Sequence, residues 1–325
     1  MDITQISNPS EWRFVARGNA NAVYQYNGLK KQLKRKVLRM RIKKSLEQYV
    51  PTLELYNFLS VKCEQKLQKY ILETELVKVT PRFISELETQ GFELMASEHF
   101  AFLMDNILYG EFDTFELSKN CKLHLQESPP CELKSIILEL KPKWLYDCKT
   151  NYCRNCSLNQ YRNLERHFCP LDFLKVNSIG KGINDFLSKV PKNSKIVDIA
   201  SNELRGLLGA YLARLDNVFQ TIKVLQEIKD TNDIICNVKC KDDISDDLLF
   251  AMTLRDVGVF LIFTKFIPEE KNETLGYTVT AHVYDLDLKL REKYEYWKAT
   301  DLLLEDYYNA CNKQWSICNA DEYLD

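Results

Sequence analysis

The chain has 325 residues, of which 45% are hydrophobic and 28% are charged, and its formal net charge is −2. These values predict a soluble globular protein with one large or two modest domains. They argue against a nucleic-acid or membrane partner, because proteins that bind such surfaces are usually broadly basic.

The N-terminal region predicts a small β-rich domain. Residues 12–28 have a strand–turn–strand pattern with small residues at the turn. The basic stretch 30–44 surrounds a short strand at residues 37–40, and Arg39 lies inside this apolar run. An arginine there can face a phosphate, which is the role of the strand lysine in protein kinases.

A helical region and a long connection follow. Residues 45–75 have the periodicity of helices, and Pro51 is expected to divide them into two pieces. We expect an N-terminal lobe at residues 1–98, a hinge and connection at 99–134, and a C-terminal lobe at 135–325.

A buried strand is predicted within residues 135–144, which are Ser-Ile-Ile-Leu-Glu-Leu-Lys-Pro-Lys-Trp. Pro142 cannot donate to a β-ladder, so the strand should end there. Lys141 and Lys143 then stand at a strand end, where α/β sheets commonly place a binding crevice, and two ammonium groups suggest an anionic ligand. The alternative is a strand that runs into solvent with its lysines extended into water.

The rest of the chain alternates helical and strand patterns. Amphipathic helices are predicted at residues 173–189 and 202–229, and an aromatic-rich helix at 297–324. Strands are expected to hold Asp256 and Asp285. The whole pattern predicts an α+β fold with a small β-rich N-terminal lobe and a larger α/β C-terminal lobe.

The chain supplies, in order, the parts that a phosphoryl-transfer site needs. Small residues occupy the first turn, paired lysines follow, Asp256 lies in apolar sequence, and Asp285 precedes Lys289. The alternative for Asp256 is an ion pair with Arg255, which is less favoured because neighbours on a strand face opposite sides.

Five motifs then resemble one family over nearly the whole chain. They are Glu139-Leu-Lys-Pro-Lys143, Cys153-Arg-Asn-Cys156, Cys169-Pro-Leu-Asp172, Arg255-Asp256 and Asp285-Leu-Asp-Leu-Lys289. Their order and spacing resemble the inositol-pentakisphosphate 2-kinase family, and the compact length resembles a yeast-type member. The turn after Trp12 is similar to the family's glycine-rich loop, although Ala16 and Arg17 stand where the family has Gly and Glu.

The resemblance implies a bilobal fold distantly like that of protein kinases. It implies ATP and Mg²⁺ as cosubstrate and cofactor, and phosphorylation of the axial 2-hydroxyl of inositol pentakisphosphate to give inositol hexakisphosphate. It also suggests nuclear or cytosolic residence, and we expect a monomer that binds no nucleic acid or membrane.

The resemblance also implies roles for single residues. Asp256 matches the catalytic aspartate, with Lys141 close to the transferring phosphate, and Asp285 matches the magnesium ligand, with Asp287 ranked second. The proposed nucleotide contacts are Gly18, Asn19, Asn21, Val23 and Arg39, together with Asp285. The proposed inositide ligands are Lys141, Lys143, Arg162, Asn193, Lys289 and Lys293.

A zinc site is predicted between the Cys-Arg-Asn-Cys and Cys-Pro-Leu-Asp motifs. Eleven cysteines, without a signal peptide or a long apolar span, favour a reducing intracellular compartment, where metal binding is favoured over a disulfide. Cys153, Cys156, His167 and Cys169 supply four soft ligands, and Cys148 could replace one of them. The alternative is buried cysteines that pack as small hydrophobic residues.

Two other functions compete with a kinase. One is a catalytically inactive inositide-binding module, which the altered glycine loop favours and the intact Asp256 and Asp285 oppose. The other is an RNA-associated zinc protein, which the acidic balance and the lack of aromatic–basic RNA motifs oppose.

Overall fold

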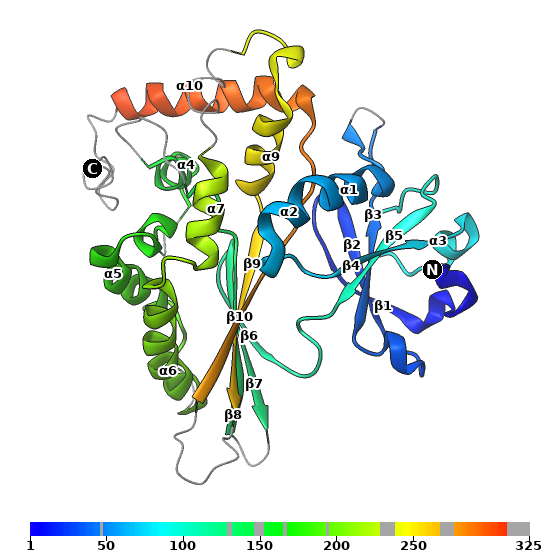
Figure 1. The fold of residues 1–325 in the computed structure, drawn as a ribbon, viewed down its shortest axis with the longest axis horizontal. Coiled ribbons are helices and arrows are strands. Elements are labelled where there is room, and N and C mark those ends of the chain that lie inside the picture. Colours follow the sequence, from blue (N-terminus) through cyan, green and yellow to red (C-terminus); the bar gives the residue numbers. More distant parts are fainter. Residues whose placement is uncertain are drawn as a thin grey trace. The chain divides into compact units, whose positions relative to one another are not determined.

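The computed structural model describes residues 1–45, 48–128, 132–145, 153–164, 168–192, 195–227, 238–266 and 276–310. The chain forms two compact units, Met1–Gly110 and Glu111–Asp325. Each unit has its own five-stranded antiparallel sheet and its own helices, so the chain has an α+β fold (Figure 1). The boundary at Gly110 falls inside residues 99–134, the segment expected to join two lobes.

The first unit is built on an antiparallel sheet of strand order β1-β2-β3-β5-β4. The strands are β1 (Trp12–Arg17), β2 (Asn21–Tyr26), β3 (Lys36–Arg41), β5 (Phe100–Asp105) and β4 (Thr74–Lys78). The predicted strand–turn–strand and the strand around Arg39 are therefore confirmed. Side chains alternate across this sheet, so buried Tyr24, Leu38 and Leu103 join the core on one face while Arg39 lies on the other.

In the first unit, Pro51 directly precedes α1 (Thr52–Phe58). A π-helical turn (Leu59–Cys63) and α2 (Glu64–Leu67) continue it, and α3 (Pro81–Glu86) follows β4. Gln48 has 3₁₀-helical structure before Pro51, and residues 46–47 lie outside the described part, so the division of two helical pieces at Pro51 stays a prediction. Pro51 stands directly before α1, where its missing N–H has no helical partner to lose.

The second unit is built on a sheet of strand order β10-β9-β8-β7-β6. The strands are β6 (Asp113–Ser118), β7 (Cys121–Ser128), β8 (Glu132–Leu140), β9 (Gly258–Phe266) and β10 (Gly276–Tyr284). Strands β6 and β7 occupy much of the expected connection. In the register of the sheet, Leu140 pairs with Val259, and Gly258 pairs with Tyr284. The end of β8, the start of β9 and the end of β10 therefore lie side by side at the same end of the sheet.

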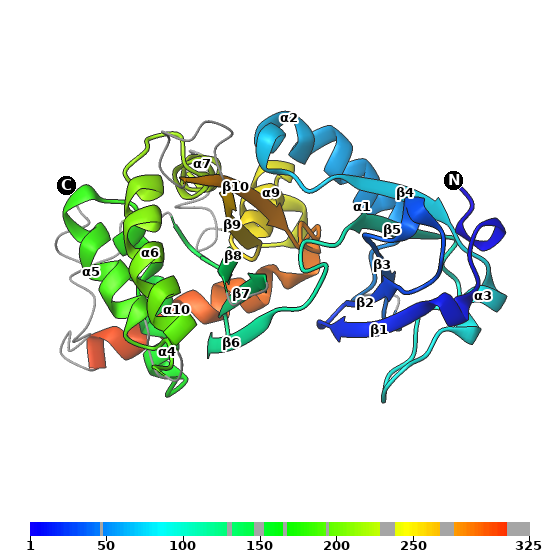
Figure 2. The ribbon, with the colours of Figure 1, turned by 90° about the horizontal axis from the view of Figure 1, so that it is seen from below.

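Helices make up the rest of the described part of the second unit. They are α4 (Arg154–Tyr161), α5 (Val176–Leu187), α6 (Lys195–Leu212), α7 (Val218–Gln226), α9 (Asp246–Leu254) and α10 (Tyr294–Ala310). Helices α5, α6 and α7 lie on one side of the sheet in both views (Figures 1 and 2). The single helix expected at 202–229 is two helices, because the Asn217 side chain caps a new start and Leu215 is 90% exposed.

Two expectations about the aspartates are wrong. Asp256 does not lie on a strand; it lies in the turn between α9 and β9. Strand β10 ends at Tyr284, so Asp285 and Asp287 do not share a strand face. The helix expected at 297–324 is described from Tyr294 to Ala310, and residues 311–324 lie outside the described part. Among the described residues, every helix is too short or too polar to cross a lipid bilayer.

Candidate active site

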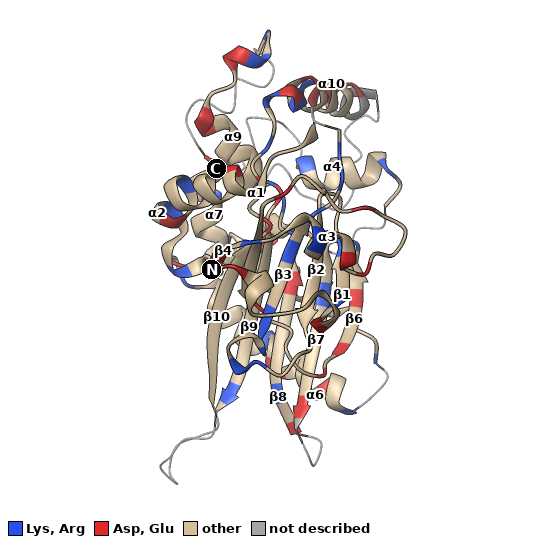
Figure 3. Cartoon of the chain, turned by 90° about the vertical axis from the view of Figure 1, so that its right-hand side faces the viewer, with Lys and Arg blue, Asp and Glu red and all other residues tan. Residues whose placement is uncertain are grey.

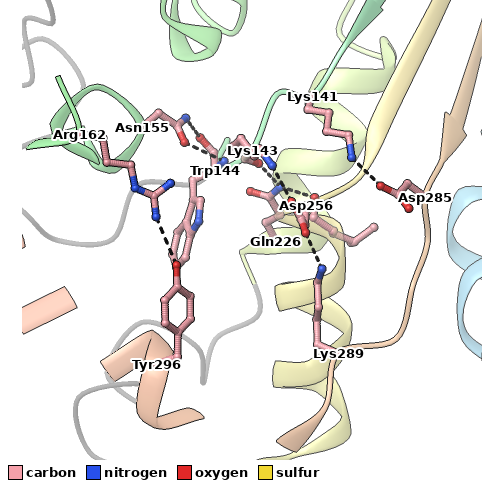
Figure 4. Close-up of polar contacts among 11 residues, drawn as sticks. Lys141, Lys143, Trp144, Asn155, Arg162, Gln226, Asp256, Asp285, Lys289 and Tyr296 are labelled. Atoms are coloured by element: carbon pink, nitrogen blue, oxygen red, sulfur yellow. Dashed lines mark hydrogen bonds and ion pairs between the residues drawn. The ribbon is translucent and has the colours of Figure 1, made fainter. Parts of the chain in front are cut away.

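Five charged side chains meet where the strands of the second sheet end (Figure 4). The Lys141 Nζ donates to Asp285 Oδ2 at 2.5 Å. The Asp256 carboxylate accepts one hydrogen bond at each oxygen, from Lys143 Nζ at 2.6 Å and from Lys289 Nζ at 2.6 Å. All of these pairs join residues far apart in sequence, so the fold brings together the lysines and aspartates expected to form the site.

Strand ends deliver the first of these pairs. Lys141 follows the last residue of β8, and its N–H still donates to Asn120 O, which continues the ladder by one bond. Pro142 then ends the pairing, as predicted. Asp285 follows the last residue of β10, one strand beyond β9, so the sheet itself sets the distance between Lys141 and Asp285.

A short helix delivers the second pair. Ser245 caps the start of α9, and the Asp256 N–H bonds to Thr253 O at the end of that helix. The negative end of the helix dipole therefore lies next to the Asp256 carboxylate, which disfavours its charge. The two lysine ammonium groups offset this unfavourable field.

Two site residues have a backbone that side-chain-bearing residues seldom adopt. Lys143 has φ = 59° and Asp285 has φ = 63°, both in the left-handed region. Such residues keep this conformation only where their surroundings hold it, and they concentrate at functional sites. The local strain therefore falls on one cation and one carboxylate of the candidate site.

The ion pairs shift the acidity of the site. Burial favours the neutral form of Asp256, but Lys289 and Lys143 outweigh it and hold the pKa of that carboxyl well below its usual range. Burial opposes the charge of Lys141, but the Asp285 carboxylate outweighs it and raises the pKa of Lys141. Because 44% of the Asp256 side chain is exposed, solvent screens its pairs and weakens them.

A partly buried hydrogen-bond network lies at the ends of β8 and β10, the strands that precede Lys141 and Asp285. The Tyr284 hydroxyl donates to Glu139 Oε1 at 2.6 Å, and His124 Nε2 lies 3.1 Å from Glu139 Oε2. Burial would raise the pKa of Glu139, but the bonds with His124 and Tyr284 outweigh it and lower that pKa. The Tyr284 ring crosses β9 at Gly258, where an added Cβ would lie 2.1 Å from Tyr284 Cζ.

An aromatic side chain lies behind the Lys143–Asp256 pair. The Trp144 ring has the Arg255 guanidinium 3.9 Å from its centroid and the Arg154 guanidinium 4.2 Å from it. Arg255 is 2% exposed and also donates to Gln226 O at 3.4 Å. The Asp256 carboxylate is bonded to lysines, so the alternative of an Asp256–Arg255 pair does not describe this site.

The remaining inositide candidates lie elsewhere or outside the described residues. Arg162 ends α4, and its guanidinium donates to Tyr296 Oη at 3.3 Å (Figure 4). Lys293 is exposed on a short 3₁₀ helix, Arg291–Lys293. Asn193 lies outside the described residues. The roles of these three residues in inositide binding stay predictions.

The first unit holds the proposed nucleotide residues. Gly18 and Asn19 lie in the β1–β2 turn, where Gly18 N donates to Asn21 O at 2.8 Å. A Cβ at Gly18 would meet no atom within 4 Å, so the fold itself does not require glycine there. Val23 pairs with Arg39 across the sheet, and both lie on the face opposite the core. Strand β3 carries three basic residues, Lys36, Arg39 and Arg41 (Figure 3).

Asn21 takes part in a buried network of the first unit. Its Oδ1 accepts from Arg41 Nη1 at 2.9 Å, and the Arg41 guanidinium lies 5.8 Å from the centroid of the Tyr49 ring. The Tyr49 hydroxyl donates to Glu98, which also accepts from Thr52 N at 2.8 Å. The network thus joins the start of β2 to the start of α1. The Asn21 side chain therefore has a structural role beside its proposed nucleotide contact.

Three of the four predicted zinc ligands lie together. The Sγ atoms of Cys153, Cys156 and Cys169 all lie within 4.8 Å of one another and are buried. They pack with Leu171 in a small apolar cluster, so both zinc binding and apolar packing fit them. His167 lies outside the described residues.

Sequence patterns did not single out the side chains that support the site. Gln226 is fully buried and occupies a position of α7 where the helical period, with Val218 and Ile222, demands an apolar residue. A polar residue in an apolar stripe is a signal that could have identified it. Glu139 stood inside a recognised motif, but the sequence alone gave no sign of its partner Tyr284.

The geometry suits the transfer of a charged group. Three ammonium groups can neutralise phosphate oxygens, and two carboxylates can orient a hydroxyl or hold a metal ion. Carboxylate oxygens are ligands that Mg²⁺ prefers, and the Asp285 side chain is 30% exposed, so it can present an oxygen to an ion.

Comparisons with known proteins agree with this chemistry. A family model described as inositol-pentakisphosphate 2-kinase matches residues 14–302. An inositol-pentakisphosphate 2-kinase of Debaryomyces hansenii is 37% identical over 98% of this chain and 97% of its own length.

More distant yeast relatives have the same name. The inositol-pentakisphosphate 2-kinase of Saccharomyces cerevisiae is 30% identical over 56% of this chain and 59% of its own length. That of Kluyveromyces lactis is 26% identical over 90% and 94%. All three relatives are named as kinases, which gives no support to the alternative of a catalytically inactive module.

Proposed function

The chain belongs to the inositol-pentakisphosphate 2-kinase family, and from that membership we propose its reaction. It transfers the γ-phosphoryl group of ATP to the axial 2-hydroxyl of inositol 1,3,4,5,6-pentakisphosphate, and the product is inositol hexakisphosphate. The observation that carries the proposal is that three lysines bond to two aspartates where the strands of the second sheet end. These residues are Lys141, Lys143, Lys289, Asp256 and Asp285.

The three lysines are proposed to bind the inositide. Each makes a short, charged hydrogen bond to a carboxylate, and a phosphate oxygen is an equivalent acceptor. A substrate that lacks one phosphate leaves an ammonium group without its new partner, so the cluster discriminates by the number and position of phosphates.

Asp256 is proposed to orient the 2-hydroxyl and to accept its hydrogen bond. Its lowered pKa keeps it ionised near neutral pH, with two lysines beside it. The same lysines make it a weak base, which suits a loose phosphoryl-transfer transition state, where the acceptor hydroxyl needs positioning more than early deprotonation.

Asp285 is proposed to hold Mg²⁺, with Asp287 as a second candidate. When bound, Mg²⁺ neutralises charge on the phosphates of ATP. Lys141 holds the Asp285 carboxylate in place at 2.5 Å and is proposed to lie close to the transferring phosphate as well. The chain's own contribution here is to fix the carboxylate through the strained backbone at Asp285.

In the first unit, the residues proposed to contact ATP are Gly18, Asn19, Asn21, Val23 and Arg39. The open space at Gly18 allows the backbone to approach a phosphate closely, and Arg39 lies on the sheet face opposite the core, next to Phe102. The family resemblance adds a bilobal fold distantly like that of protein kinases, with Met1–Gly110 as the nucleotide-binding lobe.

Zinc, quaternary state and location complete the proposal. Cys153, Cys156 and Cys169 offer thiolates close enough for one tetrahedral Zn²⁺, with His167 as the proposed fourth ligand. We also propose a monomer in the nucleus or cytoplasm. Metal analysis with Cys156→Ser as the control tests the zinc site: purified protein with no zinc would contradict it.

A phosphotransfer assay tests the function. The purified full chain is incubated with ATP, Mg²⁺ and inositol 1,3,4,5,6-pentakisphosphate, and phosphorus NMR locates the new phosphate. The expected product carries it at the axial 2-position, with one ADP formed for each inositide. ATP hydrolysis without a phosphorylated inositide, or transfer to another acceptor, would contradict the proposal.

A further inference from the structure

Residues 143–145 are held by the side chains of two amides rather than by a neighbouring strand. Gln226, the last residue of α7, donates from Nε2 to Lys143 O at 2.9 Å and accepts at Oε1 from Leu145 N at 2.8 Å. Asn155, in α4, accepts at Oδ1 from Trp144 N at 3.2 Å and donates from Nδ2 to Trp144 O at 2.7 Å. Four consecutive polar groups of the backbone are thus bonded: Asn155 bonds both groups of Trp144, and Gln226 bonds the flanking Lys143 O and Leu145 N, as two flanking strands would (Figure 4).

This support begins where the sheet stops. The β8 ladder ends at Leu140, and Pro142 offers no N–H for further pairing. The next residue, Lys143, has φ = 59°, a conformation that a lysine keeps only when it is held. The two amides bond the backbone at that residue and at the two that follow, so they hold the strained part of the loop.

Gln226 also reaches the loop of the opposing carboxylate. Its Nε2 donates to Leu254 O at 3.0 Å, at the end of α9 and two residues before Asp256. One fully buried side chain therefore bonds to the backbone near both members of the Lys143–Asp256 ion pair. A shift of either loop breaks a bond to this amide.

We propose that Gln226 and Asn155 are positioning residues that fix the Lys143 ammonium group for the inositide phosphates. This inference rests on the proposed function, because the ligand of Lys143 is taken to be an inositide phosphate. The two amides act through Lys143 and touch no reacting atom.

A purely structural role makes a different prediction. Buried polar groups need partners whatever their function, so loss of Gln226 would lower stability in any case. With a purely structural role, the substitution causes the same loss of inositide affinity whether or not Lys143 is present. A positioning role gives a loss of inositide affinity that disappears once the Lys143 ammonium group is gone.

The test uses Gln226→Met in the full chain, since methionine keeps the volume and removes the amide. The matched control is Gln220→Met, on the same helix, because Gln220 Nε2 also donates to a backbone carbonyl, Leu174 O at 2.8 Å. Each is made with and without Lys143→Ala, and the KM for inositol pentakisphosphate and kcat are measured.

We expect Gln226→Met to raise the inositide KM about tenfold, the order of one charged hydrogen bond, with a smaller change in kcat. Gln220→Met should change neither by more than about twofold. In the Lys143→Ala background, Gln226→Met should add no further rise. A rise of equal size in both backgrounds, or equal effects of the two methionines, would overturn the proposal.

Asn155→Asp gives a second arm should Gln226→Met fail to fold. It keeps the oxygen that accepts from Trp144 N and removes the amide group that donates to Trp144 O, and Asn159→Asp on the same helix is its control. We expect a severalfold, Lys143-dependent rise in KM, and an unchanged KM would overturn the inference. A wild-type chain without inositide kinase activity would instead overturn the proposed function, so the two failures are distinct.

Discussion

The two ends of the candidate site are held by different means. Lys141 and Asp285 follow directly from strands β8 and β10, and the sheet between them fixes their distance. Lys143 and Asp256 lie in loops beyond the sheet, and side chains hold those loops. Many backbone hydrogen bonds together fix a sheet and survive a substitution, whereas a bond from a side chain is lost when that one residue is replaced.

The difference teaches where single substitutions should act. At the strand end, the bonds of Glu139 with Tyr284 and His124 supplement a ladder that already fixes the strands, so loss of the Tyr284 bond should have a small effect. At the loop end, one amide bonds three backbone groups, so its loss should be felt. Substitutions of the charged residues themselves should have larger effects than either of these.

The largest effect is expected for Asp256→Ala. Removing a group that orients the acceptor hydroxyl typically costs ~10²–10⁴-fold in rate. We expect kcat to fall by that order while the inositide Kd changes much less, because the three lysines remain. Near-normal turnover of a folded variant would exclude this role, and circular dichroism controls for folding.

The lysines should come next. Lys141→Ala and Lys143→Ala should each weaken inositide binding by about 10–100-fold, the range for one charged hydrogen bond, and flatten its dependence on salt. Calorimetric Kd values at several ionic strengths measure both. We expect the larger loss for Lys141, since it lies next to the fixed strand. If the salt dependence of binding is unchanged, that lysine extends into solvent and does not bind the inositide.

Tyr284→Phe should have a smaller effect, because the sheet still sets the Lys141–Asp285 distance. Loss of one partly buried hydroxyl bond costs ~1 kcal/mol of stability, so we expect a lower melting temperature. We also expect a severalfold fall in kcat, because Tyr284 directly precedes Asp285 and loses the bond that holds it. Tyr277→Phe is the matched control: Tyr277 lies on the same strand and donates to Glu203 at the other end. An equal fall in kcat for Tyr277→Phe would show that the effect of Tyr284→Phe is not specific to the site.

The smallest effect is a pH dependence of stability. The pKa of Asp256 is lowered by folding, so its ion pairs stabilise the native state at a pH above the usual aspartate pKa of 3.8 and are lost as the pH falls below that value. The melting temperature of wild type should exceed that of Asp256→Asn near neutral pH, and the gap should narrow below about pH 4. A gap independent of pH would mean that the ion pairs do not contribute.

Sequence reasoning identified the charged residues of the site better than their supports. Pro142 made the end of β8 predictable, and with it the placement of Lys141. Residues 248–263 form one apolar run, in which a helix and a strand adjoin with Asp256 at the junction. A continuous apolar run hides such a junction, because periodicity cannot separate a buried helix from a buried strand.

The supports depend on contacts that no local pattern contains. Gln226 contacts Lys143 across 83 positions, and Tyr284 contacts Glu139 across 145. These partners are set by how α7 and β10 pack, which the residue types nearby do not encode. Trp144 shows the same limit, since both of its guanidinium partners come from other segments.

The position of Trp144 has an optical consequence. Its indole ring has two permanently charged guanidinium groups close to its centroid, and Trp144 directly follows Lys143 in the chain. The emission energy of an indole responds to charges placed around the ring, so movement of either guanidinium changes the colour of its fluorescence. The loop thus contains an intrinsic label, and the difference spectrum against Trp144→Phe reports when phosphate ligands reach its neighbouring lysine.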